Sequence, residues 1–85
     1  MTNHTIHLAL GNPDRFRIVD LLAAEEPNSL CVRDIARLVE CSQSQTSQHL
    51  ATLRAAGLVV SRRDKNTIWN TLAPNVIWPI EVFRP

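Results

Sequence analysis

The sequence predicts one small, mainly α-helical domain that carries a β-hairpin near its C-terminal end. Apolar residues recur at helical spacing in several segments between residues 5 and 56. Two runs rich in β-branched and aromatic residues follow, at residues 58–63 and 67–72, on either side of a short polar turn. The chain has 85 residues, which suits one domain with a limited core. We therefore expect no multidomain enzyme, and pairing with a second copy would help to stabilise the fold.

The N-terminal half predicts three helices separated by clear breaks. The first covers residues 5–10, and the second covers residues 13–24, beginning at a proline and ending at the polar stretch EEPNS. The apolar pattern resumes at Leu30 and predicts a compact third helix that ends at Glu40 or Cys41.

The fourth helix, over residues 43–56, has an unusual polar face. Ser42 and Gln45 form a capping box at its start, and Gly57 marks its end. At 100° per residue, one side should be buried and carries Thr46, Leu50, Leu53 and Gly57. The opposite side carries Ser44, Gln45, Gln48, Thr52 and Ala55, with Ser47 and His49 on the flanks. A surface helix built only for stability would favour Ala, Glu and Lys, so this face indicates binding to another molecule.

The predicted hairpin carries the basic residues Arg62, Arg63 and Lys65 at its tip. Charge is also divided unevenly along the chain: residues 1–40 have four arginines and six acidic residues, a net −2, whereas residues 41–85 have five basic and two acidic residues, a net +3. Charged hairpin residues also guard against aggregation, so alone they are weak evidence for a binding site. Beside the polar helix, they indicate contacts to phosphates.

Helix, turn, polar helix and basic hairpin form the winged helix-turn-helix arrangement, which we assign to residues 1–73. The helix over residues 43–56 should contact base edges in the major groove of double-stranded DNA, and the two-stranded antiparallel wing over residues 58–72 should contact phosphates. Glutamine pairs with adenine there, and serine or threonine pairs with either base type. The predicted DNA-binding residues are Ser42, Gln43, Ser44, Gln45, Ser47, Gln48, His49, Thr52, Arg62, Arg63 and Lys65.

Long ordered motifs carry a family resemblance over residues 8–73. The segments LGNPDRFRIVDLL and LCVRDIARLVECSQSQTSQHLATLRAAGLVVSRRD, with the signature SQxxxSxHLxxLxxAGLV, resemble the ArsR-type (ArsR/SmtB) bacterial winged-helix repressors. The resemblance implies a homodimeric transcriptional repressor that binds an inverted-repeat operator. Many such repressors release the operator when a metal or an oxidant arrives.

The cysteine pattern departs from the thiolate metal sensors of that family. Those proteins have CVC where this sequence has Cys31, Val32 and Arg33, so this motif cannot form a two-thiolate site, and we assign no metal ligands. Cys31 and Cys41 remain an alternative redox or metal-responsive pair. They lie at opposite ends of the third helix, about 15 Å apart for ten helical residues, beyond the roughly 7 Å limit for a disulfide. Small buried hydrophobic residues are the plainer interpretation.

The C-terminal tail, residues 74–85, departs from the family's long dimerisation helix. Pro79 prevents one continuous helix. The tail is nevertheless apolar and contains Val76, Ile77, Trp78, Ile80, Val82 and Phe83. We expect it to pack across a twin subunit, because a monomer would expose these side chains.

The competing functional class is a winged-helix protein-interaction module, which would show no DNA preference. The sequence contains no recognisable motif for a phosphate loop, a catalytic nucleophile or a metal cluster, so we expect neither an enzyme nor a cofactor. It also lacks the roughly 18 apolar residues that a membrane span needs and the start of a signal peptide, so we expect no membrane contact and a cytoplasmic location.

Overall fold

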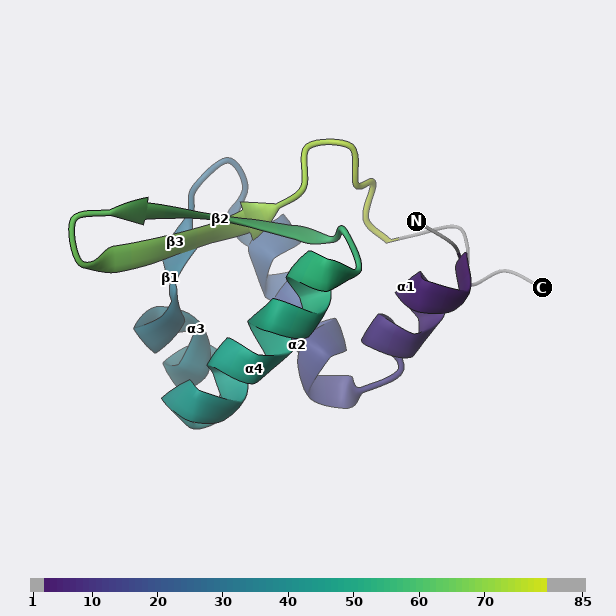
Figure 1. Ribbon diagram of the computed structural model, residues 1–85, viewed down its shortest axis with the longest axis horizontal. Helices are drawn as coiled ribbons and strands as arrows, with labels where there is room; N and C mark the ends of the chain where they lie inside the picture. Colours follow the sequence, from purple (N-terminus) through teal and green to yellow (C-terminus); the bar gives the residue numbers. More distant parts are fainter. Residues whose placement is uncertain (1–2, 80–85) are drawn as a thin grey trace.

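The computed structural model describes residues 3–79, which form a helical domain with a small sheet (Figure 1). In chain order the elements are α1 (Asn3–Leu10), α2 (Pro13–Glu25), β1 (Leu30–Cys31), α3 (Val32–Val39), α4 (Gln43–Ala55), β2 (Val59–Asp64) and β3 (Thr67–Leu72). The hairpin of β2 and β3 extends past the helices at one end of the molecule (Figure 1). The structure therefore confirms the winged helix-turn-helix fold. Within residues 3–79, no helix is both long and apolar enough to cross a membrane.

Local hydrogen bonds explain where two of the helices begin. The side chain of Asn12 accepts hydrogen bonds from the backbone N–H groups of Asp14, at 2.9 Å, and Arg15, at 3.1 Å. Asn12 therefore caps α2, which starts at the proline that directly follows it. At α4, the Gln45 N–H donates to Ser42 Oγ at 3.0 Å, and the Ser42 N–H donates to Gln45 Oε1 at 3.2 Å. This confirms the predicted capping box.

The sheet has three antiparallel strands in the order β1-β3-β2. The predicted two-stranded wing is confirmed, with Val59 opposite Leu72 at its base and Asp64 opposite Thr67 near its tip. The third strand, β1, was not predicted, because the apolar pattern placed Leu30 at the start of a helix. Leu30 and the following cysteine pair with β3 instead, because its unpaired edge satisfies their backbone groups better than an isolated helical turn would.

The core lies where α2, α3 and α4 meet the base of the sheet. Ile18, Ile35, Leu50 and Leu53 have 0% of their surface exposed. Because the buried side of α4 contributes two of these side chains, burial of apolar surface fixes which side of that helix faces solvent.

A buried polar network connects the sheet to the end of α4. Asn70 has 0% of its surface exposed. Its Nδ2 donates to the Leu30 carbonyl at 3.0 Å, and its Oδ1 accepts from the Ser61 hydroxyl at 2.6 Å. Arg54, near the end of α4, donates in turn to that hydroxyl oxygen at 3.1 Å. The network thus links all three strands to α4.

Replacing Asn70 with alanine is expected to lower the free energy of unfolding by about 1–3 kcal/mol, because buried polar groups would lose their partners. Urea unfolding followed by circular dichroism measures this change. Asn75→Ala is the matched control, because it makes the same truncation at an exposed position and should change stability by less than about 0.5 kcal/mol. Equal effects of the two substitutions would contradict the structural role of Asn70.

The described part of the C-terminal tail, up to Pro79, packs partly on its own domain. Val76 and Trp78 lie against the core, and the Trp78 ring meets Phe16 edge-on, with 5.0 Å between the ring centroids. Trp78 Nε1 also donates to Asp20 Oδ1 at 2.9 Å. Ile77 is 80% exposed and remains available to a partner. The other apolar residues of the predicted dimer-packing tail, Ile80, Val82 and Phe83, lie outside the described residues.

Candidate nucleic-acid interface

One side of α4 presents hydroxyl and amide groups to solvent. Thr46, Leu50 and Leu53 are fully buried on the other side, as predicted. The exposed predicted DNA-binding residues at this helix are Ser42, Gln43, Ser44, Gln45, Ser47, Gln48 and Thr52. No acidic side chain interrupts α4, so nothing on the helix itself repels phosphate.

Gly57 is the exception to the predicted helical pattern. The helical spacing predicted a buried position for Gly57, but this residue is exposed. Because α4 ends at Ala55 and Gly57 adopts a left-handed φ of 79°, the 100° period no longer applies there. Ala56 is 2% exposed and takes the buried place instead.

The polar side chains of α4 differ in how free they are to bind a ligand. Among the described residues, no hydrogen bond holds the side chains of Gln43, Ser44, Ser47 and Gln48. Gln45 is partly engaged, because its Oε1 serves the capping box while its Nε2 remains a donor. Thr52 Oγ1 donates to the carbonyl of the residue four positions earlier, at 3.2 Å. Gln48, at the centre of the exposed side, is therefore the side chain best placed to contact a base.

His49 faces the preceding helices rather than solvent. Its side chain is 17% exposed, with Nε2 lying 3.9 Å from Asp14 Oδ2 and Nδ1 lying 3.5 Å from Arg15 Nη1. Arg15 donates to the Ala9 carbonyl at 2.6 Å and to the Leu8 carbonyl at 3.2 Å. Because an arginine side chain can only donate hydrogen bonds, Nδ1 of His49 is the acceptor of this contact. The sequence predicted His49 to be a DNA-binding residue, whereas these contacts support a role in bracing α4 against α2.

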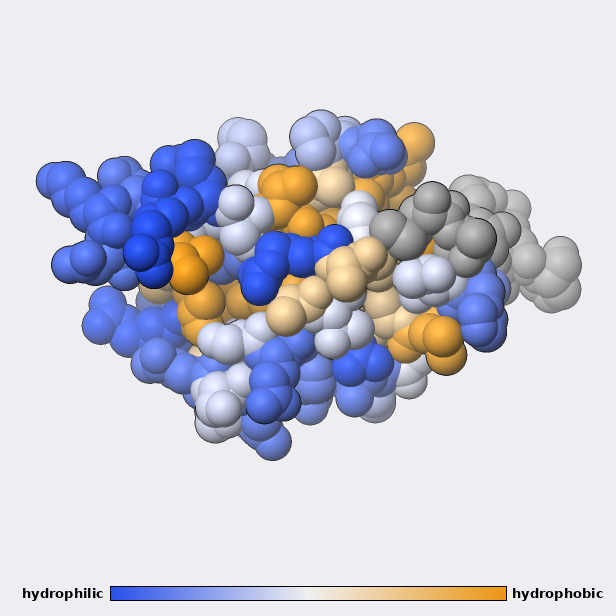
Figure 2. Space-filling view, viewed as in Figure 1, coloured by the Kyte–Doolittle hydropathy of each residue, from blue (hydrophilic) through white to orange (hydrophobic). Residues whose placement is uncertain are grey.

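The wing carries its positive charge at the tip. Arg62, Arg63 and Lys65 are exposed, and among the described residues none of them has an ion pair. Lys65 takes a left-handed φ of 58°, which closes the short turn between β2 and β3. Figure 2 shows hydrophilic side chains gathered over this end of the molecule. Unpaired cations on a projecting hairpin are suited to bind an extended anion.

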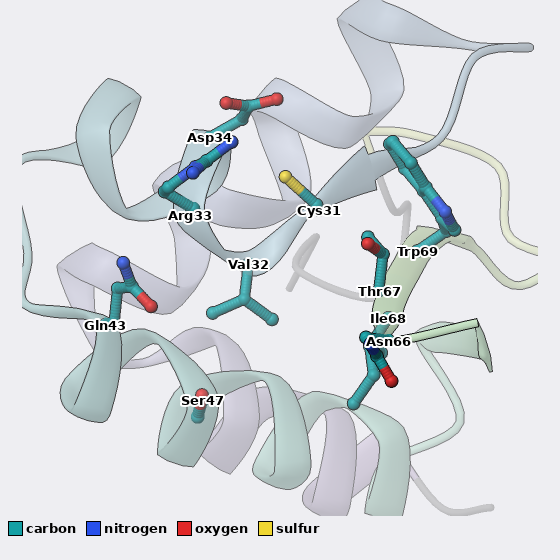
Figure 3. Close-up of a pocket in the computed structure, with 10 residues that line it drawn as sticks. All are labelled: Cys31, Val32, Arg33, Asp34, Gln43, Ser47, Asn66, Thr67, Ile68 and Trp69. Atoms are coloured by element: carbon teal, nitrogen blue, oxygen red, sulfur yellow. The ribbon is translucent and has the colours of Figure 1, made fainter. Parts of the chain in front are cut away.

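An open hollow of about 630 Å³ separates α4 from the wing and brings the two predicted regions together. Gln43 and Ser47 enter it from α4, and Asn66 and Thr67 face them from the wing (Figure 3). The remaining wall is the start of α3 with parts of β1 and β3, and consists of Cys31, Val32, Arg33, Asp34, Ile68 and Trp69. Three of the lining residues, Arg33, Asn66 and Thr67, were not among the predicted DNA-binding residues. Only the position of Asn66 and Thr67 beside a basic turn hinted at a binding role.

The cysteines do not form a disulfide, and both are free and partly buried. Burial raises the pKa of the Cys41 thiol, the charge and hydrogen bonding of Asp14 raise it further, and the charge of Arg17 opposes this change. Since the thiolate is the reactive form, a raised pKa makes Cys41 a poorer nucleophile and metal ligand. Within residues 3–79, no group of three or more His, Cys, Asp or Glu side chains could hold a metal ion.

Comparisons with known proteins agree with this geometry. The sequence profile of the arsR family of bacterial regulatory proteins matches residues 12–61. Nodulation protein NolR of Rhizobium meliloti is 42% identical over 72 residues, which cover 85% of this chain and 57% of that protein. A transcriptional repressor SmtB homolog of Synechocystis is 39% identical over 67 residues, covering 79% of this chain and 48% of that protein. The chain thus spans about half the length of these relatives.

A solved structure shares the fold. The homodimeric winged helix-turn-helix DNA-binding domain Mb0332 of Mycobacterium bovis, described as a possible ArsR-family transcriptional regulator, superposes with a TM-score of 0.74 at 30% identity. The match covers 82% of this chain and 62% of that one.

Proposed function

Because the chain belongs to the ArsR family of bacterial regulatory proteins, we propose that it binds double-stranded DNA sequence-specifically and acts as a dimeric transcriptional repressor. The observation that carries the proposal is the shared hollow, in which Gln43 and Ser47 of α4 face Asn66 and Thr67 of the basic wing. A helix that contacts bases and a hairpin that contacts the adjacent backbone need this proximity.

In the proposed complex, α4 lies in the major groove. Gln48 points away from the core and has a free amide, which can donate to N7 and accept from N6 of adenine. The hydroxyls of Ser44 and Ser47 can pair with either base type, and Gln45 contributes its remaining donor. The wing cations then bind phosphates irrespective of sequence. Arg15, bonded to His49 and α1, helps to hold α4 at a fixed angle.

A homodimer is part of the proposal because an inverted repeat requires two copies of α4. Those copies should lie about 34–36 Å apart, which matches one turn of the duplex. Leu8 on α1 is 63% exposed and Ile77 is 80% exposed, so apolar surface is available for subunit contact. The homodimer found for Mb0332 supports this assembly.

We assign the protein to the cytoplasm, where it would meet bacterial DNA, and we assign it no enzymatic activity because its relatives are regulators. Regulation through Cys31 and Cys41 is not part of the main proposal. The raised pKa of Cys41 works against a reactive thiol pair.

An electrophoretic mobility shift assay tests the proposal. The protein should shift DNA from upstream of its own gene at physiological salt, while an unrelated duplex of equal length should compete poorly. Equal affinity for both duplexes, or no shift of either, would contradict sequence-specific binding and favour the protein-interaction module.

A further inference from the structure

The hollow contains one cation that the proposed DNA contacts leave unused. Arg33, near the start of α3, lines the wall between α4 and the wing and is exposed (Figure 3). Among the described residues, it has neither a hydrogen bond nor an ion pair. Asp34 is the one acidic residue in the lining, and its carboxylate lies 3.7 Å from Arg37. The guanidinium of Arg33 is thus uncompensated.

We propose that the hollow receives the sugar-phosphate backbone of DNA and that Arg33 binds a phosphate there. This inference rests on the proposed function. In helix-turn-helix proteins the first helix, here α3, crosses the backbone while the second lies in the major groove. A strand that leaves α4 and continues to the wing must pass the mouth of the hollow, because both elements line it.

The remaining lining is suited to the same ligand. Gln43 and Asn66 provide amide donors on facing sides of the hollow, and Thr67 adds a hydroxyl donor from the wing (Figure 3). Arg33 adds the full charge that these neutral groups lack, in a planar fork that can bond two phosphate oxygens. Arg33 therefore contributes general affinity and fixes how α3 lies on the duplex, whereas base choice stays with α4.

Arg37 is a matched control for Arg33. It carries the same charge on the same helix, one turn later, and is exposed. It pairs with Asp34 and does not line the hollow. Alanine at either position should preserve the helix, because alanine has the highest helix propensity.

Fluorescence anisotropy with a labelled 30-base-pair duplex, titrated between 50 and 200 mM salt, tests the proposal. Arg33→Ala should reduce the salt slope of log affinity by about 1.8, the value for the two phosphates that a dimer would contact through Arg33. The loss of affinity should therefore be about 12-fold larger at 50 mM than at 200 mM salt. Arg33→Lys should keep most of the slope, and Arg37→Ala should keep all of it. If Arg33→Ala and Arg37→Ala give the same slope, the proposal is overturned.

A second experiment locates the phosphate. Single phosphates of the duplex are replaced in turn by neutral methylphosphonates. At least one replacement should lower the affinity of the wild-type protein for the duplex and leave the affinity of Arg33→Ala unchanged. If every replacement lowers the affinity of both proteins equally, Arg33 does not bind a phosphate. Failure of the wild-type protein to bind any duplex at 50 mM salt would instead contradict the proposed function itself.

Discussion

Replacing Arg62 and Arg63 together with alanine is expected to weaken binding to every duplex and to flatten the dependence of affinity on salt. Both side chains lie at the tip of the wing, exposed and without an ion pair among the described residues. Each should release the counterions of one phosphate in each protomer, so the dimer loses four phosphate contacts and the salt slope of log affinity should fall by about 3.6. Measured against the wild type, the loss of affinity should therefore be about 150-fold larger at 50 mM than at 200 mM salt.

The charge-conserving double variant, with lysine at positions 62 and 63, is the control for this experiment. It should retain the slope even if it loses the geometry of the guanidinium. The alanine variant should also unfold with nearly wild-type stability, because exposed substitutions change it by about 0.5 kcal/mol or less. An alanine variant that lost affinity for one duplex and kept it for others would contradict a phosphate role for the wing.

Gln48→Ala is expected to have the opposite effect, with base preference lost and general affinity kept. One good bidentate pair supplies about 1–3 kcal/mol of discrimination against the wrong base, so the preference at one position of each half-site should fall roughly 5- to 150-fold. Selection from a randomised duplex pool, followed by sequencing, measures that preference. The variant should fold, since the side chain is exposed and alanine favours helix.

An unrelated duplex provides the internal control for Gln48→Ala. The affinity of the variant for this duplex should stay within about twofold of the wild-type affinity, because Gln48 carries no charge and the contacts to phosphates are unchanged. If the variant selects the same duplexes with the same stringency, Gln48 does not contact a base. The wing variant should give the reverse result and thereby separates the two kinds of contact.

Features of the chain that depend on local sequence were predictable. The capping box at Ser42 and Gln45 sets the start of α4 by hydrogen bonds between residues three positions apart. The buried side of that helix follows from its apolar spacing, with Leu50 and Leu53 fully buried. The hairpin follows from two strand-like runs and a polar turn.

Features that depend on contacts between distant residues were not predictable. Leu30 is a strand residue only because β3 lies beside it, 40 residues away in the chain, with Asn70 bonded to its carbonyl. The bracing of His49 by Asp14 and Arg15 likewise joins helices far apart in sequence. A helical wheel gives the direction of a side chain but not the neighbour that it meets.

The candidate site was predictable by element but not in its full composition. Helical spacing and charge identified α4 and the wing. The sequence drew attention to Arg33 only because this residue stands where the thiolate sensors have a second cysteine. Its position in the wall of the hollow was not predictable, since that position depends on how α3 packs against α4 and the sheet. The tail also shows this limit, because its apolar composition did not reveal that Trp78 would pack edge-on against Phe16.

The central claim is that α4 contacts base edges in the major groove. The most direct measurement replaces each adenine of the preferred duplex in turn with 7-deazaadenine, which removes the N7 acceptor from the major groove and leaves the minor groove unchanged. Affinity should fall at one or more adenines in each half-site when the wild-type protein is titrated by anisotropy. Unchanged affinity at every adenine, with binding lost instead when minor-groove atoms are altered, would contradict the claim.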